Sequence, residues 1–301
     1  MMSGEAAVLS VEGLAVRYGP RTVLDRVSFE VPRGSVFALL GRNGMGKTSL
    51  VRCALGLQRP AHGLVRLFGE DAWRSRSRAM ARIGVVPEEP DAPPDMTAAE
   101  LLAFCAPLYP TWDGTCARAR LERSAVPLGV PFGRLSKGQK GAVMLALALA
   151  AAPELLILDD PTLGLDAVAR RALYDELIGD LADRGTTALV TTHDLDGIEP
   201  IADRVAILHG AQLVVNETSD ALKWRFRRVR CGGPAGPFSW EPFEAMAAVE
   251  KDWGREAVVT NFTEERLDAF VARTGSTDVE VGALSLEEIF LSVVSTPGGR
   301  S

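Results

Sequence analysis

The chain has 301 residues, of which 47% are hydrophobic and 24% are charged. This composition is that of a folded globular protein, with enough length for a large α/β domain and a smaller appendage. The formal net charge of -6 argues against general nucleic-acid binding, which needs excess positive charge against phosphates, so no nucleic-acid partner is expected.

The first predicted elements are strands. Residues 8–17 and 27–31 have strand patterns and are separated by turn residues, which predicts antiparallel N-terminal strands. Residues 35–40 form a continuous apolar run, which is typical of a strand buried on both faces of a parallel sheet. A Gly-rich loop and then a helix to about Leu55 follow it. Further apolar strands are predicted at 64–68, 83–86, 155–158 and 187–191.

The loop at residues 41–48 has the complete pattern G-x-x-x-x-G-K-[ST], between a buried strand and a helix. Its glycines let backbone N–H groups converge on phosphate oxygens, and the helix N-terminus adds a favourable dipole. Lys47 is expected to reach the β- and γ-phosphates of a bound nucleotide, and the Thr48 hydroxyl to ligate Mg²⁺. The residues predicted to bind the nucleotide here are Gly41, Arg42, Asn43, Gly44, Met45, Gly46, Lys47, Thr48 and Ser49.

Prolines interrupt the helical patterns that follow, which predicts an inserted helical subdomain at about 88–141. Thr97 and Glu100 have the spacing of a capping box, and so do Ser136 and Gln139. A helix is therefore expected to begin at each of the two pairs. By itself, the second box indicates nothing more than a helix start.

The apolar strand at 155–158 ends in two carboxylates, which places acids at the sheet edge where ligands bind in open α/β folds. Asp159 is expected to hold Mg²⁺ directly or through water. Asp160 is expected to orient or deprotonate the attacking water. The alternative for Asp160 is that it caps the turn at Pro161. The two motifs together predict an α/β fold with a P-loop NTPase core and a mainly parallel sheet, a class that includes kinases, GTPases and helicases.

Residues 135–139, Leu-Ser-Lys-Gly-Gln, distinguish among these classes because they resemble the signature of the ABC ATPase family. The resemblance extends over roughly the first 220 residues. Tyr18 resembles the aromatic residue that stacks on adenine, residues 161–166 the loop after the catalytic acid, and His193 the switch histidine. The resemblance implies that Ser136, Gly138 and Gln139 close over the γ-phosphate held by a second subunit, so that two chains enclose two ATP molecules.

Two positions depart from the family pattern. Asp160 stands where the family usually has Glu, so its carboxylate lies roughly 1.5 Å closer to the backbone. Glu88 stands where the family usually has Gln. We expect Asp160 to support turnover through a repositioned water, aided by Glu88 near Mg²⁺. The predicted catalytic residues are therefore Asp160, His193, Glu88 and Lys47, and the predicted metal ligands are Thr48, Asp159 and Glu88.

Residues 1–222 are predicted to form the nucleotide-binding domain, and residues 223–301 a small α+β accessory domain without a catalytic constellation. The longest nearly apolar run, 142–152, is shorter than the roughly 20 residues that cross a bilayer and predicts a buried helix. Residues 160–166 and 285–290 resemble the single-domain ATPases of bacterial export systems. This resemblance implies a separate transmembrane permease, a second ABC ATPase subunit, identical or related, and a cytoplasmic position on the inner face of the membrane.

Three other functions share part of this motif pattern. A chromosome-organising ATPase needs a long coiled coil between Glu88 and Leu135, where this chain has a short proline-rich segment instead. A ribosome-associated relative normally has two ATPase cassettes, and one is visible here. A regulatory ATP sensor with slow hydrolysis stays open because of Asp160 and Glu88.

Overall fold

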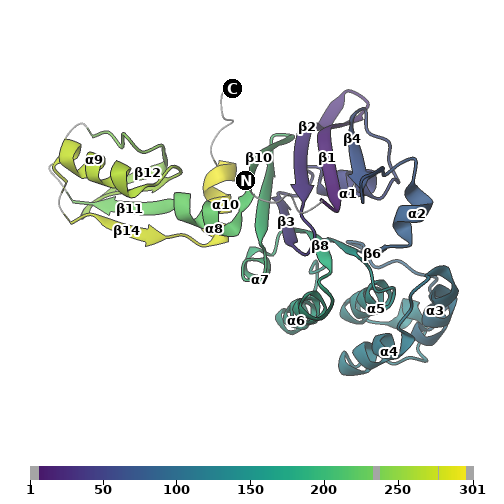
Figure 1. Ribbon diagram of the computed structural model, residues 1–301. Helices are drawn as coiled ribbons and strands as arrows, with labels where there is room; N and C mark the ends of the chain where they lie inside the picture. The colour runs from purple at the N-terminus through teal and green to yellow at the C-terminus, as the bar shows by residue number, and fades with distance from the viewer. Residues whose placement is uncertain (1–6, 233–237, 277, 296–301) are drawn as a thin grey trace. The chain divides into compact units, whose positions relative to one another are not determined.

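The computed structural model describes residues 7–232, 238–276 and 278–295. The chain divides into two compact units, Met1–Asn216 and Glu217–Ser301 (Figure 1). The boundary expected at residues 222 and 223 lies inside α8 (Ser219–Arg225), a helix of the second unit.

The first unit contains the mainly parallel sheet that the sequence predicts. Its strand order is β10-β9-β3-β8-β7-β6, and the β3–β8, β3–β9, β6–β7 and β7–β8 pairs are parallel. Every residue of β3, β7 and β8 is buried, as expected for strands covered on both faces. The strands are β3 (Val36–Gly41), β6 (Ile83–Val86), β7 (Leu155–Asp159), β8 (Thr187–Thr192), β9 (Arg204–His209) and β10 (Gln212–Thr218).

A second, antiparallel sheet of the first unit has the order β2-β1-β4-β5. Its strands are β1 (Leu9–Tyr18), β2 (Arg21–Val31), β4 (His62–Leu67) and β5 (Glu70–Asp71). The strand predicted at 64–68 therefore belongs here and not to the parallel core, because β4 pairs with β1 from Leu9↔Leu67 onward. Phe29 stacks on Phe37 of β3 with ring centroids 4.9 Å apart, and Leu50 of α1 (Lys47–Ala54) joins the same apolar core.

The helical segment comprises α3 (Ala98–Cys105), α4 (Gly114–Arg123) and α5 (Lys137–Ala150), which Figure 1 shows side by side. Both predicted capping boxes are confirmed. The Thr97 hydroxyl accepts from Glu100 N at 3.2 Å, and the Ser136 hydroxyl accepts from Gln139 N at 3.2 Å. The apolar run at 142–152 falls mostly in α5, whose buried side chains share a core with Leu101.

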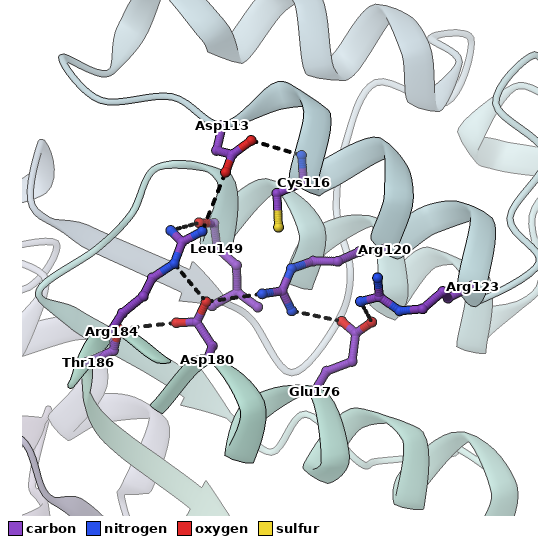
Figure 2. A network of polar contacts seen from close by, with 9 residues as sticks. All are labelled: Asp113, Cys116, Arg120, Arg123, Leu149, Glu176, Asp180, Arg184 and Thr186. Carbon is purple, nitrogen blue, oxygen red and sulfur yellow. Dashed lines mark hydrogen bonds and ion pairs between the residues drawn. The ribbon is translucent and has the colours of Figure 1, made fainter. Parts of the chain in front are cut away.

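A polar network connects α4 to α6 (Ala167–Arg184), and Figure 2 shows it from close by. The Arg120 guanidinium binds Glu176 Oε2 at 3.3 Å and Asp180 Oδ1 at 3.1 Å. Arg123 binds the other Glu176 oxygen at 3.0 Å, and Arg184 Nε lies 3.4 Å from Asp180 Oδ1. The Asp180 side chain is 1% exposed, so the ion cluster that joins α4 and α6 is built around a buried carboxylate.

The other α-helices described in the first unit are α2 (Arg76–Met80) and α7 (Leu195–Ile198). The second unit is a small α+β fold around an antiparallel sheet of order β12-β13-β11-β14. Its strands are β11 (Arg227–Cys231), β12 (Ala245–Lys251), β13 (Gly254–Val259) and β14 (Glu280–Ala283), and its helices are α8, α9 (Glu264–Thr274) and α10 (Leu286–Ser295). Val229, Phe243 and Phe270 belong to its separate core. Across the described residues of both units, no helix is both long enough and apolar enough for a membrane span.

Candidate functional site

A cavity of about 490 Å³ lies where the parallel strands β3, β6 and β7 end. Carboxyl ends of neighbouring parallel strands meet at one sheet edge, so segments far apart in sequence contribute to a single site. The residues that line it are Tyr18, Arg21, Val23, Asn43, Gly44, Gly46, Lys47, Thr48, Ser49, Glu88, Asp159 and Asp160.

Lys47 begins α1 and is 7% exposed. The residue before it, Gly46, has a φ of 98°, and a Cβ there would lie 2.7 Å from Leu24 Cδ2, so this position excludes a side chain. Lys47 Nζ donates to Gly41 O at 2.6 Å. Burial lowers the pKa of Lys47, and the carboxylates of Asp160, Asp159 and Glu88 oppose that shift. The site therefore holds a desolvated amine beside three acids, at the N-terminus of a helix that favours anions.

Asp159 and Asp160 are both 5% exposed, and Thr191 of β8 organises them. The Thr191 hydroxyl donates to Asp159 Oδ1 at 2.5 Å and accepts from Asp160 N at 3.1 Å. The backbone carbonyl of Thr191 accepts from the same Asp160 N at 2.9 Å. Sequence reasoning missed Thr191; the available signal was a pair of hydroxyl residues, 191 and 192, ending an apolar strand.

His193 and Asp160 come together directly after strands β8 and β7. Nδ1 of His193 lies 2.8 Å from each carboxylate oxygen of Asp160. Asp160 has a φ of 48°, in the left-handed region that few non-glycine residues occupy and that often marks functional sites. This backbone conformation, together with its two bonds to Thr191, sets the direction of the shorter side chain.

The predicted magnesium ligands Thr48, Asp159 and Glu88 all line this cavity. Hydroxyl and carboxylate oxygens are suitable donors for Mg²⁺, which usually takes its other ligands from water and substrate phosphates. The donor set therefore fits the ion. In the part of the chain that the structure describes, no group of three or more His, Cys, Asp or Glu side chains could hold a metal. Thr48, Asp159 and Glu88 would leave the other positions around the ion to water and phosphate oxygens.

Tyr18 lies at the rim of the cavity and is 47% exposed. Its hydroxyl donates to Gln58 Oε1 at 2.7 Å and lies 3.2 Å from the hydroxyl of Ser49 in α1, so the side chain is tied to both residues. Arg21 and Val23 of β2 also line the cavity and were missed by sequence reasoning. The signal for them was the tight turn after Tyr18, which pairs Tyr18 with Arg21 across the hairpin.

Not every predicted loop residue faces the cavity. Gly41, Arg42 and Met45 belong to the loop but do not line it. Met45 N donates to Arg42 O at 3.2 Å, and the Met45 side chain packs against the apolar core.

The predicted signature residues Ser136, Gly138 and Gln139 line a different cavity, of about 780 Å³. The loop after Asp160 forms its opposite side. A Cβ on Gly164, which has a φ of 73°, would lie 2.7 Å from Lys137 Nζ, so the start of α5 packs directly on this loop. Within one copy of the chain, the signature and the phosphate-binding loop therefore face separate cavities.

Comparison with known proteins agrees with this geometry. Residues 24–163 match the family model described as ABC transporter. The Nod factor export ATP-binding protein I of Ralstonia nicotianae is 37% identical over 219 residues, covering 70% of this chain and 67% of that protein. The bacitracin transport ATP-binding protein of Bacillus licheniformis is 32% identical over 230 residues, covering 74% of each.

Solved structures give the same result for the fold. An ATP-binding subunit of an ABC transporter superposes with a TM-score of 0.65 at 30% identity, covering 72% of this chain and 92% of that one. A dimeric ATP-binding cassette bound to ADP and phosphate superposes with a TM-score of 0.63 at 20% identity, covering 70% and 98%.

Proposed function

Because the chain belongs to the family of ABC transporter ATP-binding subunits and is an ATPase, we propose that it works as half of a dimer that encloses two ATP molecules. The observation that supports this most directly is the separation of the two cavities. Lys47 lines one and Ser136 the other. A phosphate held by the first can meet the second only if another subunit supplies it.

Each residue of the first cavity has a role that follows from its chemistry. The Lys47 ammonium exchanges its carbonyl acceptor, Gly41 O, for β- and γ-phosphate oxygens. Thr48 and Asp159, with Glu88 near them, hold Mg²⁺, which neutralises developing phosphate charge when it is bound. The Tyr18 ring offers a flat apolar face for the adenine.

The Asp160–His193 pair performs the hydrolytic step in this proposal. An ionised carboxylate only accepts hydrogen bonds, so His193 Nδ1 donates to Asp160. Nε2 can then donate to a phosphate oxygen only when the ring is protonated. Asp160 orients the attacking water or removes its proton. The pair thus links the water-activating carboxylate to a γ-phosphate contact.

We further propose that the dimer drives a separate membrane-spanning permease from the cytoplasmic face of the membrane. The second ATPase subunit is either identical or related. The names of the relatives in Ralstonia and Bacillus, a Nod factor export protein and a bacitracin transport protein, favour outward transport. The helical segment α3 to α5 is the proposed contact with the permease.

Replacing Asp160 with Asn tests the assignment. The variant keeps the size of the side chain but loses its basicity, so it should bind ATP and Mg²⁺, accumulate as a stable dimer in light scattering, and hydrolyse ATP at least ~100-fold more slowly. Lys47→Ala is the matched control that should neither retain ATP nor dimerise. Steady-state hydrolysis by Asp160→Asn at the wild-type rate would refute the role of Asp160.

A second candidate, a regulatory ATP sensor with slow turnover, is supported by one observation. Both Asp160 oxygens are 2.8 Å from His193 Nδ1, which leaves the short side chain little freedom to bind water. ATPase activity measured with and without a co-produced permease separates the two candidates. A transport motor is stimulated by its permease, whereas a sensor stays slow in both samples.

A further inference from the structure

Three buried polar atoms beside the Asp160–His193 pair have no hydrogen-bond partner among the described residues. They are Thr162 Oγ1, Arg170 Nε and Tyr174 OH. Thr162 follows Asp160 by two positions, and Arg170 and Tyr174 lie one turn apart on α6. An unpaired buried hydroxyl is destabilising, so its presence beside a reactive pair requires a physical explanation.

The Tyr174 ring fixes the element that follows His193. Tyr174 is 6% exposed, and its ring packs against Gly197 in α7. A Cβ on Gly197 would lie only 2.3 Å from Tyr174 Cε2, so no larger residue fits without displacing the ring. The position of α7, which begins two residues after His193, therefore depends on Tyr174.

Arg170, one turn before Tyr174 on α6, contacts the same loop after His193. Its Nη1 lies 3.7 Å from Asp194 Oδ1, the atom that also caps α7 by accepting from Gly197 N at 3.4 Å. Asp194 N in turn donates to the Thr192 hydroxyl at 2.9 Å. Thus α6 contacts the residue that follows His193, and that residue is bonded to the one that precedes His193.

The Tyr174 hydroxyl lies near the hydroxyls of Thr192 and Thr162. Burial raises the pKa of Tyr174, as does the charge of Asp194, while the hydroxyls of Thr192 and Thr162 act in the opposite direction because they lie close by. The Tyr174 and Thr162 hydroxyls nevertheless make no hydrogen bond of normal geometry.

We propose that Tyr174 is a positioning residue for hydrolysis: its ring holds the His193 loop, and its hydroxyl pairs with Thr162 in the nucleotide-bound state, which draws the Asp160 loop into place. This inference rests on the proposed function, in which Asp160 and His193 act on ATP.

The hydroxyl pair is tested by Tyr174→Phe, Thr162→Val and the double variant, with Tyr109→Phe in the helical segment as the control. We expect each single variant to lower kcat about five- to tenfold with less than a twofold change in KM for ATP, since one hydrogen bond of the active state is lost. The double variant should lose no more than either single one. The melting temperature of the nucleotide-free variants should stay level or rise, because an unpaired hydroxyl is removed.

An unchanged kcat, losses that multiply in the double variant, or a melting temperature that falls together with kcat would overturn the hydroxyl pairing. The ring is tested without ATP. Tyr174→Ala should shift the NMR resonances of the His193 ring, which are assigned with the variant His193→Gln. In the same sample the resonances of His209 in β9 should stay in place. In the control Tyr109→Ala the His193 resonances should stay in place as well. An unmoved His193 resonance would overturn the positioning role. If the wild-type chain hydrolyses no ATP, the proposed function fails, and this spectrum still decides the role of the ring.

Discussion

The ion cluster between α4 and α6 gives a stability prediction that is independent of function (Figure 2). Arg120→Met keeps most of the side-chain volume but removes the charge. It leaves the carboxylate of Asp180, whose side chain is 1% exposed, without its closest cation. Breaking a buried pair from one side typically costs about 3–5 kcal/mol because the other charge stays buried.

Two remaining contacts of Asp180 reduce this figure. Arg184 Nε stays 3.4 Å from Oδ1, and the Thr186 hydroxyl donates to Oδ2 at 3.1 Å. We therefore expect Arg120→Met to lower the free energy of unfolding by about 2–3 kcal/mol. For a unit of this size, that corresponds to a fall in melting temperature of roughly 5–10 °C.

The assay is differential scanning calorimetry of the full chain, following the transition of the larger unit. Arg123→Met is the matched control: the Arg123 side chain is 60% exposed in its pair with Glu176, so its loss should cost less than about 1 kcal/mol. Adding Asp180→Leu to Arg120→Met removes the stranded carboxylate and should recover about 1 kcal/mol or more relative to the sum of the single changes. Equal effects of Arg120→Met and Arg123→Met, or strict additivity, would refute the reasoning.

Two further predictions concern pH and the metal site. Hydrogen bonds from Arg82, and then from Arg33, lower the pKa of Glu154 from 4.5 to about 2, so its contribution to stability is fully present above the ordinary pKa and is lost as the pH falls toward 2. Melting curves of Glu154→Gln and wild type should accordingly differ by a constant amount above pH ~5 and converge near pH ~2; a gap that persisted in acid would contradict the assignment. Thr191→Val removes the hydroxyl between Asp159 and Asp160 and should reduce Mg²⁺-dependent ATP hydrolysis about tenfold without affecting Mg²⁺-free ATP binding. Thr187→Val at the other end of β8 is the control, and an unchanged Mg²⁺ dependence in Thr191→Val would count against the role of Thr191.

Much of the first unit could be predicted because its signals are local. The spacing of its glycines indicates the loop at residues 41–48. Pairs of side chains three residues apart indicate the helix starts at Thr97 and Ser136. Apolar runs at β3, β7 and β8 predict buried strands without reference to any partner. These patterns depend on the geometry of a few consecutive residues, which is why the sequence alone reveals them.

Strand order, in contrast, is decided by long-range packing. β8 lies between β3 and β7 although it comes last of the three in the chain, and only this insertion brings Thr191 against Asp159 and Asp160. The strand at 64–68 could not be assigned to its antiparallel sheet for the same reason, since an apolar run does not specify its neighbour.

By itself, then, the sequence determined the phosphate-binding loop, the acids at the strand ends, the helix starts and the family. The tertiary structure alone decided that Tyr174 packs on Gly197, that Arg120 meets Asp180, and that the signature and Lys47 face separate cavities. The physical reason is that such contacts join residues whose separation along the chain has no periodicity, so they exist only once helices and strands have packed.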